Sequence, residues 1–306
     1  MARVLGGPEA IAECVRTLSA GGVVAFPTET VYGLGADALD ADAVAEVFAL
    51  KGRPSDNPLI VHVAGDAMAR RVVSDWTDDA RRLAERFWPG PLTLVLPRSD
   101  ALPDAVTAGG STVGVRAPAH PLTLALLEAF GGPLVGPSAN RSGRISPTTP
   151  EHVERSFAEC DLPIMDGGAC ARGIESTVLD LTSEPPIVLR PGVITPGEIS
   201  AVLGRPVEAA STSNDGPERS PGRLGPHYRP QAPVTLVGAG EPEPAGARVE
   251  LPADAAQCAA MLYDALHQAD GSDPDRIVVV LPAERRGDEA VWSAILERLG
   301  RAAHPD

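Results

Sequence analysis

The sequence predicts an α/β or α+β protein built on a twisted mixed sheet, with a smaller, Rossmann-like α/β unit at its C-terminal end. Two observations predict this class. Short apolar strands alternate with helices through residues 1–205, and a second run of strands and helices follows over residues 234–306. The length of 306 residues suits two domains, and a hydrophobic content of 43% supplies ample core. We therefore expect a first domain at 1–205, a linker at 206–233 and a second domain at 234–306.

The N-terminal part begins with a helix, predicted over residues 9–20, where apolar side chains recur at helical spacing before Gly21-Gly22. Residues 22–63 then form an ordered series: a strand at 23–26, a Thr-rich turn at 27–35, a helix at 41–50, a basic turn at 51–58 and a strand at 59–63. Both turns adjoin apolar elements, which is where α/β proteins gather ligand-binding groups.

The remaining elements continue the alternation, and Pro or Gly turns bound most of them. In the first domain we predict helices at 78–88, 121–130, 151–157 and 196–203, and strands at 92–96, 112–116, 134–136, 163–165, 177–181 and 187–190. In the C-terminal unit we predict strands at 234–237, 249–251 and 276–281, and helices at 253–267 and 288–301. Strand order cannot be derived from these patterns.

The segment at 206–233 differs from its surroundings, with six prolines and three glycines in 28 positions and almost no apolar periodicity. Such a composition predicts a linker that is too stiff to be a free coil.

Composition and charge restrict the class of protein. A net charge of −15 argues against a broad nucleic-acid-binding face, which is normally basic. The four cysteines, at 14, 160, 170 and 258, form no C-x-x-C pair, which favours reduced thiols. The chain has no run of 18 apolar residues, and residues 1–8 lack a basic segment followed by an apolar one. We expect a soluble, untargeted, cytoplasmic protein.

Lys51 stands out because it is the only lysine among 26 basic residues. A chain that otherwise uses arginine indicates a need for a small ammonium in the basic turn, where movable donors suit phosphate or carboxylate. The sequence contains no P-loop, no G-x-G-x-x-G, no G-x-S-x-G and no H-E-x-x-H motif. A set of polar residues beside apolar strands remains: Thr28, Thr30, Tyr32, Lys51, Arg53, Asn57, His62, Thr93, Arg116, Ser138, Asn140, Ser142, Ser176, Thr177 and Arg190.

Each of these residues also has a structural interpretation when it is taken singly. Lys51 could complement a helix dipole, His62 could be a hydrogen-bonded structural histidine, and Tyr32 could be a core aromatic. The hydroxyl residues could form turns and caps, and the arginines could form surface ion pairs. Because the residues recur together at strand ends, we favour a shared cleft. Three arginines, a lysine and many hydroxyls would suit a polyanion with a polar organic part, such as a nucleoside triphosphate.

Several segments carry a resemblance to a known family. They are Pro27–Leu34 (P-T-E-T-V-Y-G-L), Lys51–Leu59 (K-G-R-P-S-D-N-P-L), Pro89–Leu94 (P-G-P-L-T-L), Gly114–Pro118 (G-V-R-A-P), Pro137–Pro147 (P-S-A-N-R-S-G-R-I-S-P), Glu175–Val178 (E-S-T-V) and Leu189–Gly192 (L-R-P-G). Together they resemble the L-threonylcarbamoyladenylate synthase family, with its YrdC-like domain, over about residues 8–205. The pattern of Ser220-Pro221-Gly222 followed by His227-Tyr228-x-Pro230 resembles the segment that joins the two domains of the long family form.

The resemblance implies a concave cleft and an ATP-dependent reaction. L-threonine, bicarbonate or CO2, and ATP would give threonylcarbamoyl-AMP and pyrophosphate, and a partner complex would transfer the threonylcarbamoyl group to the tRNA adenosine next to the anticodon. It implies a nucleotide group of residues: Lys51, Arg53, Asn57, Ser138, Asn140, Ser142, Ser176, Arg190 and Tyr228. It implies a threonine and carbamate group: Thr28, Thr30, Tyr32, His62, Thr93, Arg116 and Thr177.

The chemistry that this family implies requires no protein nucleophile, so catalysis would come from positioning two anions and neutralising charge. Lys51 and Arg53 are the residues we expect to neutralise the phosphates, with Mg²⁺ delivered by ATP and no metal site of the protein's own. Tyr228, in the stiff linker, could close over the cleft as a lid. The last helix lacks the Gly-Leu-Gly opening of the long form, and the C-terminal unit could be structural or regulatory.

Three other functions remain open at this stage. A cleft lined by Arg and Lys could hold RNA, although the acidic balance argues against it. A related domain could adenylate carbamoyl phosphate, although such enzymes usually carry further domains. A non-catalytic interaction protein would not require the polar residues at the strand ends.

Overall fold

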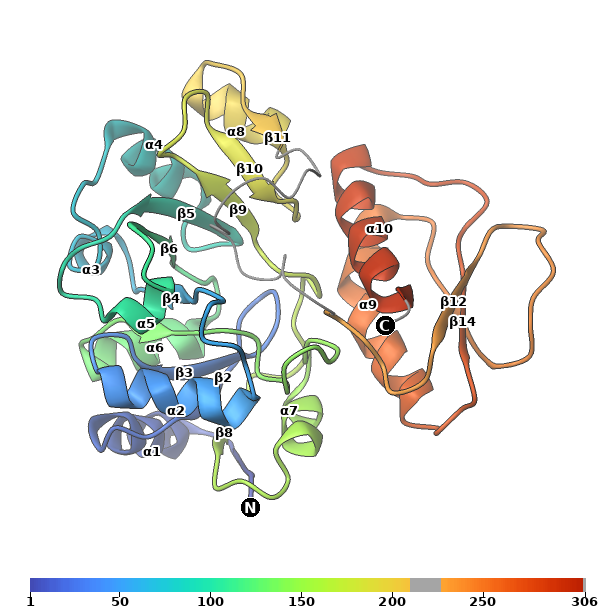
Figure 1. Cartoon of the computed structure of the whole chain (residues 1–306), viewed down its shortest axis with the longest axis horizontal. Helices are drawn as coiled ribbons and strands as arrows, with labels where there is room; N and C mark the ends of the chain where they lie inside the picture. The colour runs from blue at the N-terminus through green and yellow to red at the C-terminus, as the bar shows by residue number, and fades with distance from the viewer. Residues whose placement is uncertain (210–226, 305–306) are drawn as a thin grey trace.

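The computed structural model describes residues 1–209 and 227–304 (Figure 1). In chain order its strands are β1 (Arg3–Leu5), β2 (Val24–Phe26), β3 (Gly33–Asp37), β4 (Ile60–His62), β5 (Leu92–Pro97), β6 (Thr112–Arg116), β7 (Leu134–Val135), β8 (Pro163–Met165), β9 (Thr177–Asp180), β10 (Ile187–Arg190), β11 (Glu208–Ala209), β12 (Val234–Val237), β13 (Ala247–Glu250) and β14 (Ile277–Val280). Its helices are α1 (Pro8–Ser19), α2 (Ala41–Lys51), α3 (Asp66–Ala69), α4 (Asp78–Phe87), α5 (Asp104–Thr107), α6 (Pro121–Phe130), α7 (Pro150–Ser156), α8 (Pro196–Leu203), α9 (Ala255–Asp270) and α10 (Glu289–Ala303).

The described strands form two sheets. The larger sheet has the order β1-β8-β2-β3-β7-β4-β6-β5-β9-β10-β11 and mixes parallel with antiparallel pairs. The smaller sheet has the order β12-β14-β13, and both of its pairs are parallel. This arrangement confirms the predicted mixed α/β architecture and supplies the strand order that the sequence does not give.

Most predicted elements are present, and β6, α6, β8, β10, α8 and β12 have the predicted bounds. The sequence does not predict β1, α3, α5 or β11, which are short and carry little periodic signal. In the C-terminal unit, the strand predicted at 249–251 lies at Ala247–Glu250, and the helix predicted at 253–267 lies at Ala255–Asp270.

The main correction concerns β3, because the sequence predicts residues 27–35 as a turn. Gly33–Asp37 instead pairs antiparallel with β2. The two glycines of this strand lie against the ring of Phe26, and a Cβ built at Gly33 would come within 2.5 Å of that ring. A strand that uses glycine to admit a neighbouring aromatic ring lacks the apolar alternation from which strands are predicted.

The larger sheet separates two hydrophobic clusters. Alternate residues of β2 face opposite sides, so that Val24 and Phe26 join α1 and α6, whereas Ala25 joins the cluster around α2 and α4. Of the described cysteines, Cys14, Cys170 and Cys258 are buried, Cys160 is half-buried, and all four are free thiols. In the described part of the chain, we find no helix that combines the length and apolar character needed to cross a bilayer.

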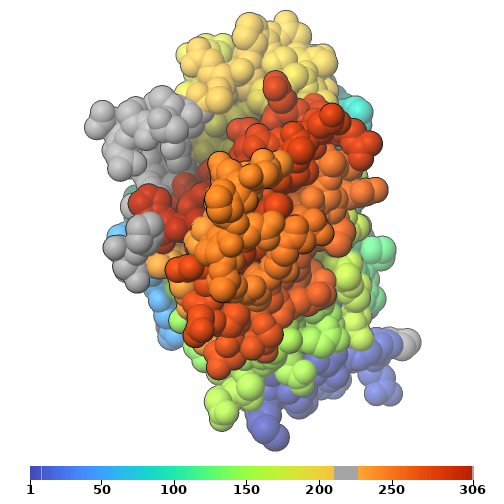
Figure 2. Space-filling model, turned by 90° about the vertical axis from the view of Figure 1, so that its right-hand side faces the viewer, coloured from blue at the N-terminus to red at the C-terminus, as the bar shows by residue number. Residues whose placement is uncertain are grey.

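The C-terminal unit packs directly on the first domain. Helices α9 and α10 lie between the small sheet and the first domain, and the unit covers one side of the molecule (Figures 1 and 2). Its core extends across this seam and includes Val31, Ile145 and Ile174 of the first domain. Of the predicted linker, residues 210–226 lie outside the described residues, and the motif Ser220-Pro221-Gly222 falls there. His227 and Tyr228 are described.

Candidate functional site

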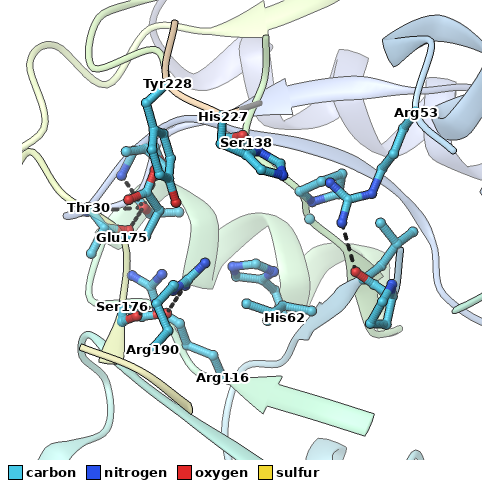
Figure 3. A pocket seen from close by; sticks show the side chains of 18 residues that line it. Thr30, Arg53, His62, Arg116, Ser138, Glu175, Ser176, Arg190, His227 and Tyr228 are labelled. Carbon is cyan, nitrogen blue, oxygen red and sulfur yellow. Dashed lines mark hydrogen bonds between the residues drawn. The ribbon is translucent and has the colours of Figure 1, made fainter. Parts of the chain in front are cut away.

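A cavity of about 620 Å³, counted with the open space at its mouth, lies where the first domain meets the seam. Figure 3 shows Arg53 on one side, Thr30, Glu175 and Tyr228 on another, and His62 with Arg116 and Arg190 between them. The predicted site residues that line the cavity are Thr28, Thr30, Arg53, His62, Arg116, Ser138, Ser176, Arg190 and Tyr228.

The other seven predicted residues lie outside the lining that the described residues form: Tyr32, Lys51, Asn57, Thr93, Asn140, Ser142 and Thr177. Most of them hold the walls in place. The Tyr32 hydroxyl donates to the Gly168 carbonyl (2.8 Å), and the Thr177 hydroxyl donates to the Ile194 carbonyl (2.7 Å). The amide of Asn140 donates to the carbonyls of Arg141 and Arg144.

The turn after β2 places two threonine hydroxyls at the cavity. The Thr28 hydroxyl donates to the Val31 carbonyl (2.6 Å) and accepts from the backbone N–H groups of Thr30 and Val31 (both 3.1 Å). The two threonine oxygens are 2.8 Å apart. Local side-chain to backbone bonds of this kind fix the conformation of a turn.

Lys51 lies behind the cavity, at the end of α2. Gly52 ends this helix in the left-handed conformation (φ 62°), and the Lys51 ammonium donates to the carbonyls of Ser138 and Asn140 (2.7 Å for Asn140). Burial, together with the charges of Arg53 and Arg141, lowers the pKa of Lys51 well below its ordinary value. The only lysine therefore ties α2 to the turn that carries Ser138.

Arg53 lines the cavity and is held by its own turn. Its guanidinium donates to the Asn57 carbonyl (3.2 Å), to the Asn57 side-chain oxygen (2.5 Å) and to the Pro58 carbonyl (2.9 Å). Asn57 thus supports Arg53 rather than lining the cavity.

His62 and Arg116 are register partners on the neighbouring parallel strands β4 and β6. Burial and the adjacent Arg116 charge lower the pKa of His62 to about 3, so the imidazole is neutral at physiological pH. A Cβ at Gly136 would lie 2.4 Å from the His62 Nδ1 atom, so glycine is needed there. Arg116 donates to the Gly90 carbonyl (3.2 Å) and pairs with Glu29 (2.8 Å).

Arg190, the last residue of β10, meets Ser176, which directly precedes the adjacent strand β9. The Arg190 guanidinium donates to the Ser176 carbonyl and to its hydroxyl oxygen (both 3.1 Å). The Ser176 hydroxyl also lies 2.8 Å from that of Thr93. Thr93 is therefore a support for a lining residue.

Sequence analysis misses four residues that the structure brings to this region. Glu29 and Glu175 lie inside the quoted segments P-T-E-T and E-S-T-V, so the motifs could have indicated them. His227 lines the cavity beside Tyr228. The fourth, Arg298, lies on the buried side of α10 and pairs with Glu175 (3.0 Å), and no local pattern indicates this contact.

Glu175 is ionised despite its burial. Burial itself raises the pKa of a carboxyl group, but the charges of Arg298 and Arg190 and a hydrogen bond from Ser146 outweigh it and lower the pKa of Glu175. Among the described residues, no group of three His, Cys, Asp or Glu side chains is arranged to hold a metal ion. Glu175 is also fully engaged by hydrogen-bond donors, which does not favour it as a metal ligand.

Comparisons with known proteins cover both parts of the chain. A family model described as "Telomere recombination" matches residues 16–192, and one described as "Threonylcarbamoyl-AMP synthase, C-terminal domain" matches residues 194–304. A threonylcarbamoyl-AMP synthase of Bacillus subtilis (strain 168) is 42% identical, over 96% of this chain and 92% of the relative. A relative of the same name from Pyrococcus abyssi is 48% identical over 71% of this chain and 64% of its own length.

A solved structure extends the likeness to the whole fold. The crystal structure of Pyrococcus abyssi Sua5 complexed with L-threonine superposes with a TM-score of 0.88 at 35% identity. The match covers 99% of this chain and 97% of that one.

Proposed function

The chain belongs to the threonylcarbamoyl-AMP synthase family, and from this premise we propose that the cavity binds ATP and L-threonine side by side. The protein is an enzyme that makes L-threonylcarbamoyl-AMP for tRNA modification, as its relatives and the threonine complex of Sua5 support. The reaction joins L-threonine, bicarbonate or CO2, and ATP, and it releases pyrophosphate. The observation that supports this site is that Arg53, Arg116 and Arg190 line the same cavity.

The reaction needs two anions to approach each other. The threonine amine adds to CO2 and loses a proton, which gives a carbamate. A carbamate oxygen then attacks the α-phosphorus of ATP, and the bond to pyrophosphate breaks. Guanidinium groups and hydroxyls fixed around the cavity would offset the repulsion and stabilise the charge that develops on the phosphoryl oxygens.

Two sets of residues divide the substrates in this proposal. The sheet wall, defined as Thr28, Thr30, His62 and Arg116, would receive threonine and its carbamate; it meets the seam wall at Thr30, which lies beside Glu175 and Tyr228 (Figure 3). The seam wall, defined as Glu175, Ser176, Arg190 and Tyr228, would receive the nucleotide together with Arg53 and Ser138. Neutral His62 can exchange hydrogen bonds with threonine without adding charge, while Arg116 suits its carboxylate.

Arg53 is the group we propose as the direct partner of the phosphates, because it lines the cavity. Lys51 would act indirectly, from outside the cavity lining. Its buried amino group holds the Ser138 turn through hydrogen bonds to the Ser138 and Asn140 carbonyls. Mg²⁺ would enter bound to the ATP phosphates, because Glu175, the one carboxylate in the described lining, is already engaged.

Tyr228 would act as part of a lid over the nucleotide, as expected from its place in the linker. It is buried, lines the cavity and adopts a positive φ of 65°. A closed aromatic cover would exclude water from the mixed anhydride. We expect Tyr228→Ala to release several times more threonine and AMP per product than the wild type, measured by chromatography. An unchanged product yield would argue against a lid.

The product would pass to a tRNA threonylcarbamoyl transferase complex in the cytoplasm. The net charge of −15 makes extensive direct tRNA binding by this chain unfavourable.

The function is tested by incubating the protein with ATP, L-threonine and bicarbonate and analysing the mixture by mass spectrometry for the threonylcarbamoyl adenylate. We expect the product only when all three substrates are present. Two further arms test the alternatives, one with carbamoyl phosphate in place of threonine and bicarbonate, and one measuring RNA binding at physiological salt. Carbamoyl adenylate formed from ATP and carbamoyl phosphate, or RNA binding without adenylate formation, would contradict the proposal.

A further inference from the structure

Arg298 is the largest fully buried side chain described, at 1% exposure, and it belongs to α10 of the C-terminal unit. A buried guanidinium is costly unless its donors are paired. Two of its hydrogen-bond partners lie across the seam. Its Nε donates to the Glu175 carboxylate (3.0 Å), and its Nη1 donates to the Pro191 carbonyl (2.9 Å). The C-terminal unit therefore places the buried guanidinium of Arg298 against the first domain.

The two cross-seam partners of Arg298 flank the nucleotide wall. Glu175 precedes Ser176 and the start of β9, and Pro191 follows Arg190 at the end of β10. These antiparallel strands pair at Arg190 and Val178. One guanidinium thus contacts the chain next to both Ser176 and Arg190, which hydrogen-bond to each other in the cavity.

Tyr263 of α9 completes the arrangement. Its hydroxyl lies 2.9 Å from one Glu175 oxygen and 3.1 Å from the other, and the Ser146 hydroxyl donates to the same carboxylate (2.7 Å). Burial and the Glu175 charge raise the pKa of Tyr263, so the hydroxyl keeps its proton and remains a donor. Glu175 therefore has one preferred position, set mainly by the C-terminal helices.

The same two side chains also support the aromatic side of the cavity. The rings of Tyr263 and Tyr228 stack with centroids 5.6 Å apart at 27°. The Arg298 guanidinium carbon lies 6.0 Å from the centre of the Tyr228 ring. A contact of this kind combines ring stacking with a cation–π interaction.

We propose that Arg298 and Tyr263 are positioning residues for the ATP half of the active site, acting through Glu175 and Tyr228. The C-terminal unit then completes the catalytic cavity instead of regulating it from outside. This inference rests on the function proposed above. It predicts a selective effect on ATP, because the hydrogen bonds, strand pairing and ion pair described for the sheet wall come from the first domain.

The test compares Arg298→Met with Leu299→Ala, which removes a fully buried core side chain from the neighbouring position of the same helix. Steady-state KM values for ATP and for threonine are measured for each variant, together with thermal unfolding and direct ATP binding by calorimetry. Losing a hydrogen-bonded charge pair should raise the KM for ATP about tenfold or more and the KM for threonine less than twofold. Leu299→Ala should lower the unfolding temperature but leave both KM values within about twofold.

Two further variants keep the proposal falsifiable if Arg298→Met folds poorly. Tyr263→Phe removes only the hydroxyl and should raise the KM for ATP by a smaller factor. The double variant Arg298→Met with Glu175→Gln should lose less ATP affinity than the sum of the two single variants, because part of the Arg298 effect passes through that carboxylate. The proposal would be overturned if Arg298→Met raised the KM for ATP and the KM for threonine equally, or if Leu299→Ala raised the KM for ATP selectively. Additive losses of ATP affinity in the double variant would also overturn it.

The test of the positioning role can be distinguished from the test of the proposed function. Adenylate formation by the wild type tests the function, and the ratio of ATP binding between variant and wild type tests the positioning role. If the wild type formed no adenylate, the proposed reaction would be refuted even if the ratio of ATP binding changed as expected.

Discussion

The two walls of the cavity are built in different ways. The sheet wall (Thr28, Thr30, His62 and Arg116) is fixed by a local turn, by strand pairing and by the Glu29 ion pair, all within the first domain. The seam wall (Glu175, Ser176, Arg190 and Tyr228) depends on side chains of α9 and α10. Under the assignment of substrates that we propose, threonine binding is set locally, whereas nucleotide binding needs both domains.

The largest predicted effects come from removing one arginine from each wall. We expect Arg116→Met to lower kcat/KM for threonine about a hundredfold or more while ATP binding changes little, because its ligand would be the threonine carboxylate. Arg190→Met should instead lower kcat/KM for ATP about a hundredfold or more while threonine binding changes little. Kinetics with each substrate varied in turn, and calorimetry with ATP alone, measure the contrast. Equal losses toward both substrates in both variants would remove the distinction between the walls.

Lys51 tests the support behind the cavity. Lys51→Met keeps the length of the side chain but leaves the carbonyls of Ser138 and Asn140 without their donor. We expect ATP-dependent pyrophosphate release to fall about a hundredfold or more, because the Ser138 turn loses the hydrogen bonds that hold it. Circular dichroism should show an intact fold. A fully active variant would refute the role of Lys51.

Glu29 tests whether the sheet wall is self-supporting. Glu29→Gln removes the charge that pairs with Arg116 at 2.8 Å in a nearly buried position. The KM for threonine should rise about tenfold, since pairs of this kind contribute a few kcal/mol at most. The matched control is Glu13→Gln, whose partners Arg3 and Arg16 lie on the surface. The control should behave as the wild type, and a threonine KM unaffected by Glu29→Gln would leave Arg116 positioned by other contacts.

The last prediction concerns stability in acid rather than catalysis. Burial lowers the pKa of His62 and His152 to about 3 and that of His267 to about 4. His152 and His267 stack across the seam with centroids 3.8 Å apart, near Asp264, Arg155 and Asp270. The unfolded chain, with a histidine pKa near 6.5, binds these protons first as the pH falls. Stability is thus fully present above about pH 6.5 and decreases toward the folded pKa values.

Each such histidine should cost about 2 kcal/mol between pH 6.5 and pH 5. Urea unfolding at both pH values measures this, and His152→Phe, which keeps a stacked ring, should reduce the slope by about one histidine. A stability that is the same at pH 5 and pH 6.5 would contradict the assigned burial of these imidazoles.

Much of the fold and part of the site could be predicted from the sequence. Helix α6 and strand β6 lie at the predicted residues because their apolar spacing and bounding turns agree. Strand β3 could not be predicted, since Gly33 and Gly35 serve the Phe26 ring rather than an apolar alternation. The unique lysine indicated a special position, but only coordinates show that its ammonium faces backbone carbonyls behind the cavity.

The seam wall shows why the rest could not be predicted. Arg298 occurs in an amphipathic helix, where a charged residue normally indicates a solvent-facing position, and its partner is 123 residues away. Nothing in the sequence distinguishes Tyr263 from an ordinary aromatic residue of the core. Motifs report the first domain's own contacts, while the contacts that the second domain supplies are visible only in three dimensions.

The central claim is that one cavity holds both substrates, each against its own wall. The most direct measurement is a crystal structure of the protein with L-threonine and a non-hydrolysable ATP analogue. We predict the triphosphate beside Arg53, Ser138 and Arg190, and the threonine carboxylate beside Arg116 with its side chain toward His62. Either ligand bound outside this cavity, or both ligands held by the same wall, would contradict the account.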